Sequence, residues 1–103
     1  MFNPFNRKRS REIEEFAVAL ARDIASRCPA SEALDGEHIS MRLARAIDEA
    51  CTRAAAYQRE QRLGMYGKAK LGTAFTMELK QAGYPEEFVD SLTRQLLFKM
   101  SAA

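Results

Sequence analysis

A long amphipathic stretch at residues 35–63 constrains the fold of this chain more than any other feature. Its apolar side chains recur at steps of three and four, which places them on one face of an α-helix: Ile39, Leu43, Ala46, Ile47, Ala50, Ala54 and Tyr57. We expect Asp35 to cap the start of this helix and Gly64 to end it. Such a helix would be roughly 40 Å long, whereas a compact domain of this size has a radius of gyration of about 13 Å. The stretch therefore predicts one long central helix that spans the molecule.

Three further segments carry the same periodicity. The first, at about 10–28, has Ser10 as a candidate cap and an apolar face formed by Ile13, Phe16, Ala17, Leu20, Ala21 and Ile24. The second, at about 68–82, repeats Leu71, Phe75 and Leu79, and Gly72 inside it predicts close approach by another helix. The third, at about 85–100, begins at Pro85, and Gly83 is expected to end the helix before it.

These four segments predict an all-α fold. We expect a single-domain bundle of four helices at about 10–28, 35–63, 68–82 and 85–100, with a tight turn at 64–67. Residues 10–103 would form one helical domain, and residues 1–9, which contain Pro4 and no apolar period, a flexible basic arm. A chain of 103 residues is long enough to bury one modest core.

The expected compartment is the cytoplasm. No apolar run approaches the length of a membrane span, and no apolar segment of a secretory signal follows the basic N-terminus. Cys28 and Cys51 each lie in or beside an apolar helical face, which favours free buried thiols over a disulfide.

The residue pattern predicts no catalytic, metal or cofactor site. His38 is the single histidine, and no cysteine or histidine follows it at ligand spacing. The adjacent acids at 48–49 and 86–87 diverge on their helices, and the glycine spacing matches no phosphate-binding loop. We therefore expect a protein that is not an enzyme and has no small-molecule substrate.

The charges are segregated along the chain. Residues 1–11 contain four basic and no acidic residues, and residues 53–70 contain five basic residues and one acidic residue. If the first helix runs antiparallel to the central one, both clusters meet at one end of the bundle. This predicts a basic patch that binds polyanions, either the phosphates of nucleic acid without recognition of its sequence or an anionic membrane surface. The patch would be formed by Arg7, Lys8, Arg9, Arg11, Arg59, Arg62, Lys68 and Lys70.

A helix-turn-helix that reads DNA sequence is a weaker interpretation. Residues 75–94 have its outline, with Gly83 as the turn glycine. However, Leu79 is bulky near the turn, and the second helix would present Glu86, Glu87 and Asp90 to phosphates.

Apolar residues outside the predicted core indicate a protein interface. Met65 and Tyr66 lie at the predicted turn, where they either tuck under the bundle or form a contact patch. Leu97 and Phe98 lie away from the inward face of the last helix, which indicates either burial on a second side or a contact with a partner. We favour a small helical adaptor that acts through protein contacts or self-association, with the polyanion binder as the alternative.

Overall fold

The computed structural model describes residues 7–35 and 38–102, and the side chains of this range outside 32–39. The elements in chain order are α1 (Arg7–Arg27), α2 (Ala30–Ala33), β1 (Leu34–Asp35), β2 (His38–Ile39), α3 (Met41–Gln61), α4 (Met65–Gln81) and α5 (Glu86–Ser101). Four long helices account for most of the described chain, so the predicted all-α bundle is confirmed.

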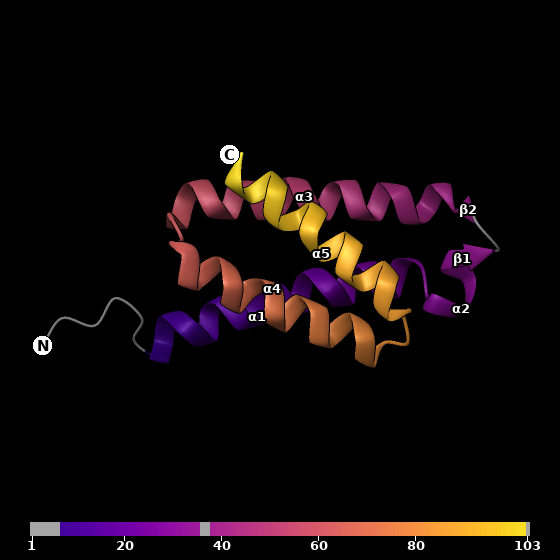
Figure 1. Cartoon of the computed structure of the whole chain (residues 1–103), viewed down its shortest axis with the longest axis horizontal. Helices are drawn as coiled ribbons and strands as arrows, with labels where there is room; N and C mark the ends of the chain where they lie inside the picture. The colour runs from indigo at the N-terminus through magenta and orange to yellow at the C-terminus, as the bar shows by residue number, and fades with distance from the viewer. Residues whose placement is uncertain (1–6, 36–37, 103) are drawn as a thin grey trace, which may run out of the picture.

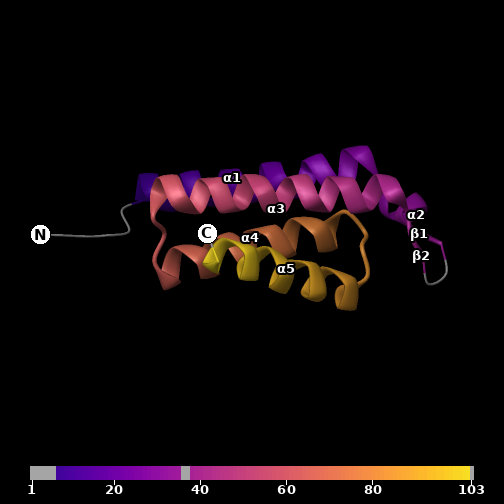
Figure 2. The same ribbon diagram turned by 90° about the horizontal axis from the view of Figure 1, so that it is seen from above.

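The helices form two antiparallel hairpins stacked in two layers. Helices α1 and α3 make one layer and α4 and α5 the other, as Figure 2 shows from above. Across the layers α4 packs along α1 and α5 packs along α3 (Figure 1). The molecule is elongated, at 52 × 25 × 20 Å with a radius of gyration of 13.8 Å. The start of α1, the end of α3 and the start of α4 consequently lie together at one end of the rod (Figure 1).

The core lies between the two layers and follows the predicted apolar faces. Fully buried side chains come from all four long helices and include Leu20, Leu43, Leu71, Phe75, Leu79, Leu96 and Met100. Phe16 of α1 stacks on Tyr57 of α3 with ring centroids 3.9 Å apart. Gly72 allows α5 to approach α4, because a Cβ there would lie 3.2 Å from a methyl carbon of Leu97.

The central helix is shorter than predicted. It begins at Met41 instead of Asp35 and ends at Gln61, so that at 21 residues it matches α1 in length. Ser40 is its N-cap, with the hydroxyl accepting a hydrogen bond from the Leu43 amide at 3.1 Å. The preceding residues pair as two short antiparallel strands, with Leu34 opposite Ile39 and Asp35 opposite His38.

The first helix begins earlier than predicted. Arg7, Lys8 and Arg9 are helical and do not belong to an arm, and the rest of that predicted segment lies outside the described residues. Arginine and lysine are good helix formers, which is consistent with this extension. A guanidinium nitrogen of Arg9 donates to the Gln61 carbonyl at 2.8 Å and ties the start of α1 to the end of α3.

The predicted tight turn at 64–67 is wrong, because α4 begins at Met65. Arg62 ends α3 in a left-handed conformation (φ 50°, ψ 55°), so no glycine serves as its C-cap. Gly64 is instead the extended N-cap of α4. By contrast, Gly83 ends α4 with φ 99°, as predicted, and the Tyr84 amide donates back to the Leu79 carbonyl at 3.2 Å. Helix α5 begins at Glu86, after Pro85 as its N-cap.

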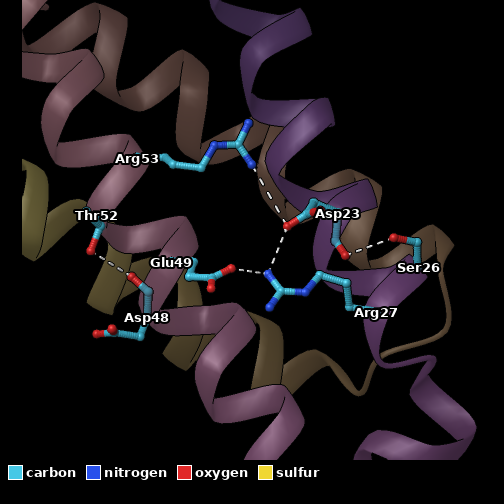
Figure 3. A network of polar contacts seen from close by, with 7 residues as sticks. All are labelled: Asp23, Ser26, Arg27, Asp48, Glu49, Thr52 and Arg53. Atoms are coloured by element: carbon cyan, nitrogen blue, oxygen red, sulfur yellow. Dashed lines mark hydrogen bonds and ion pairs between the residues drawn. The ribbon is translucent and has the colours of Figure 1, made fainter.

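A ladder of charged side chains joins α1 to α3 on the outside of the bundle (Figure 3). The Arg27 guanidinium of α1 donates a hydrogen bond to the Glu49 carboxylate of α3 and lies 3.4 Å from the Asp23 carboxylate. The Arg53 guanidinium of α3 lies 3.9 Å from the same Asp23 carboxylate. The hydrogen bond that the Arg27 guanidinium donates to the Glu49 carboxylate is the largest of the effects that raise the pKa of Arg27. Pairs as exposed as these contribute little stability each, but they favour one alignment of the two helices.

Candidate interaction surfaces

The first surface is the end of the rod where α1 begins, α3 ends and α4 begins (Figure 1). We call it the basic end and define it by seven residues: Arg7, Lys8, Arg9, Arg11, Arg59, Arg62 and Lys68. The antiparallel arrangement of α1 and α3 brings the two basic clusters of the sequence together, as the sequence analysis expected. A shallow hollow of about 480 Å³ lies here, lined by Gln58, Arg59, Arg62 and Leu63.

Most of these cations lack a carboxylate partner. Among the described side chains, no ion pair involves the following six: Arg7, Lys8, Arg11, Arg59, Arg62 and Lys68. The Lys68 ammonium lies 3.5 Å from the Ser101 hydroxyl. Lys70, the eighth predicted residue, differs from them because it forms a 2.9 Å ion pair with Glu14 of α1, which raises its pKa.

The four residues predicted as a protein interface do not form one patch. Met65 and Tyr66 are 89% and 57% exposed in the first turns of α4. Leu97 is half-buried against Gly72, so its position away from the inward face of α5 reflects burial on a second side of this helix. Phe98, at 65% exposed, lies on α5 outside the pockets that flank α4.

The second surface is the outward face of α4. Of the five exposed large apolar side chains in the described part of the chain, three lie on this helix: Met65, Tyr66 and Met77. Tyr66, Ala69, Thr73 and Met77 follow one another at helical spacing, and we call this row the α4 ridge. No member of the row is charged, and Ala69 and Thr73 leave the helix backbone open to close approach.

Two hollows flank the α4 ridge. The hollow between α1 and α4 has a volume of about 390 Å³ and includes Val18 and Ala74 in its lining. The hollow between α4 and α5 has about 300 Å³ and includes Gly72 and Leu97. Thr73 and Met77 line both, so they separate one hollow from the other.

Charged pairs bound the α4 ridge on its α1 side. Besides the pair of Lys70 with Glu14, the Arg22 guanidinium lies 3.3 Å from the Glu78 carboxylate. Each pair joins α1 to α4, and the two lie about two helical turns apart along α4. They neutralise the flank of the ridge, so an apolar partner there would not face an isolated charge.

Sequence reasoning missed the α4 ridge, although it found Met65 and Tyr66. The prediction for this segment rested on the buried seam of Leu71, Phe75 and Leu79, and none was made for the opposite side of the helix. A usable signal was present, because the row at 66, 69, 73 and 77 carries no charge in a chain that is 29% charged.

The remaining predicted features are structural or lie outside the described side chains. Cys28 and Cys51 are free and buried, and burial is the main cause of the raised pKa of Cys51. The side chain of His38 lies outside the described ones. Within the described residues, no group of histidine, cysteine and acidic side chains could hold a metal ion, and no helix is long and apolar enough to cross a membrane.

Comparison of the chain with protein-family models, curated proteins and solved structures found no match.

Proposed function

We propose that this protein is a non-catalytic helical adaptor that binds another protein through the α4 ridge. The observation that carries this proposal is the concentration of exposed apolar side chains on α4, with Met65 and Tyr66 at its start and Met77 further along. Large apolar side chains that gather on one exposed helical face are typical of sites that bind another protein.

The shape of the surface favours a helix as the bound element. Ala69, Thr73 and Met77 follow one another at intervals of four residues, which is the kind of ridge that packs into the groove of a second helix. The hollows on each side have room for the side chains of that helix. We expect the partner to contribute an amphipathic helix with apolar anchors three and four residues apart.

A cytoplasmic location remains part of the proposal. It is supported by the free, buried thiols of Cys28 and Cys51, which suit a reducing compartment.

The test is a charge placed in the middle of the ridge. Thr73 is exposed, so Thr73→Arg should leave the free energy of unfolding within about 0.5 kcal/mol of the wild type. The matched control is Ser91→Arg, at an exposed position on α5. After purification of tagged chains from their own cells, a partner that co-purifies with the wild type should remain with Ser91→Arg and be lost with Thr73→Arg. Equal recovery by both variants would refute the assignment to α4.

A further inference from the structure

The basic end carries a second inference, independent of the α4 ridge. Seven cations lie there, from α1, α3, α4 and the connection between α3 and α4, and the nearby acids are Glu12, Glu14, Glu15 and Glu60, of which Glu14 pairs with Lys70. Of the nine basic residues elsewhere in the described chain, five form ion pairs across helices and four, Arg42, Arg45, Arg94 and Lys99, form none; the five are Arg22, Arg27, Arg53, Lys70 and Lys80. The like charges at the basic end therefore repel one another, and a bound polyanion would relieve that repulsion.

Arg62 of the basic end has a strained backbone conformation. Its left-handed backbone conformation disfavours every residue with a side chain, and glycine is the usual choice at the end of a helix. The chain nevertheless places arginine there, and has glycine two residues later in an extended conformation that any residue could adopt. Strain held at an exposed cation is consistent with a role for its charge in binding.

We propose that the basic end binds the phosphate backbone of nucleic acid without reading its sequence. The rod measures 25 × 20 Å across its long axis. A duplex presents about a dozen phosphate charges over 20 Å of its length, at roughly one per 1.7 Å, which exceeds the number of cations at the basic end.

The same residues suit a bilayer less well. A protein that lies on a membrane buries a broad apolar face between the headgroups. In the described part of the chain, the large apolar side chains exposed near this end are Met65 and Tyr66 on α4 and Phe98 on the last turns of α5, against seven cations. The surface is therefore rich in charge and poor in apolar area, as nucleic-acid contacts are.

The experiment measures binding of the 103-residue chain to labelled 20-nucleotide single strands and duplexes by fluorescence anisotropy over a salt series. The test variant is the triple change Arg11→Gln, Arg59→Gln and Arg62→Gln. We expect it to weaken binding about 100-fold near 0.1 M salt and to flatten the salt dependence by about two units of slope. Replacing the same three residues by lysine should retain affinity to within about threefold, since phosphate contacts need charge more than shape.

A matched triple change separates the site from net charge. Arg42→Gln, Arg45→Gln and Arg94→Gln remove the same charge from exposed positions outside the basic end. This variant should bind within about threefold of the wild type because it keeps the proposed phosphate contacts. Equal weakening by both triples, no binding by the wild type, or binding to vesicles of anionic lipid but not to nucleic acid would overturn the proposal. Thr73→Arg should not weaken nucleic-acid binding, so failure of one proposal is distinguishable from failure of the other.

Discussion

Arg62 and Tyr84 show how single residues set the two ends of α4. Arg62 shapes the connection into this helix through its left-handed backbone, and Gly83 and Tyr84 shape the connection out of it. Both connections are compact, but the first is strained and the second is not. Two predictions follow from this difference.

Replacing Arg62 by glycine should make the protein more stable and a weaker binder of nucleic acid. The left-handed strain disappears, and the greater freedom of glycine in the unfolded chain offsets part of the gain, which leaves about 0.5–1 kcal/mol. Loss of one phosphate contact should lower affinity about fivefold near 0.1 M salt. Urea unfolding and anisotropy measure the two effects.

Arg62→Ala is the control, because it removes the charge but keeps the strain. Its affinity should fall as for Arg62→Gly, without the gain in stability. Unchanged affinity in both variants would contradict a role for this cation in binding.

Tyr84 should make stability depend on alkaline pH. Its hydroxyl is buried and donates to the Cys28 carbonyl, and burial raises its pKa to about 12. In the unfolded chain the hydroxyl of this tyrosine ionises near pH 10, so the folded state holds the proton more tightly. The contribution of this hydroxyl to the free energy of unfolding is complete below pH 10. It falls by on the order of 2–3 kcal/mol as the pH rises to about 12.

Tyr84→Phe should remove this pH dependence. At pH 8 the variant lacks the hydrogen bond, so its free energy of unfolding should be about 1 kcal/mol lower than that of the wild type. This difference should shrink between pH 10 and pH 12. Urea unfolding of both proteins across this range gives the comparison, and a constant deficit would show that the Tyr84 hydroxyl does not titrate as stated.

At the scale of elements, Gly72 determines how closely α5 packs on α4. Thr93 and Leu97 of α5 lie against it, and the Thr76 and Thr93 hydroxyls share a hydrogen bond of 2.9 Å beside it. Gly72→Leu should lower the free energy of unfolding by about 1–2 kcal/mol, because overpacking outweighs the gain in helix propensity. The exposed Ala69→Leu, on the same helix, should change it by less than about 0.5 kcal/mol. Chemical denaturation of the two variants distinguishes them, and equal stabilities would mean that α5 does not need this glycine.

The sequence predicted the helical faces well because burial repeats along a helix. Leu43, Ile47 and Ala54 in α3 and Leu71, Phe75 and Leu79 in α4 are buried as their spacing requires. Helix ends were less predictable. At the start of α3, both Asp35 and Ser40 are suitable N-caps, and which of them begins the helix depends on tertiary packing.

The candidate surfaces were predictable to different degrees. The basic end followed from charge and an assumed antiparallel hairpin, and the structure places the start of α1, the end of α3 and the start of α4 at one end of the rod. The α4 ridge was missed because threonine and alanine give no signal alone, and they matter only where the fold leaves them exposed between two hollows.

At the scale of the whole molecule, the two proposed surfaces are adjacent but separable. The α4 ridge runs along the side of the rod from the basic end, so a protein partner and a nucleic acid could be bound at the same time. This arrangement suits an adaptor that holds a protein against a nucleic acid. The α4 ridge is the central element of this proposal, because the proposed protein contact depends on it.

The most direct measurement is photo-crosslinking in living cells, with a photoreactive phenylalanine analogue at position 73 or, as control, at position 91. Both positions are exposed on helices, so both variants should fold. Position 73 should give one defined crosslinked product, joined to an amphipathic helix of another protein, and position 91 should give none. The same products from both positions, or none from position 73, would contradict the account.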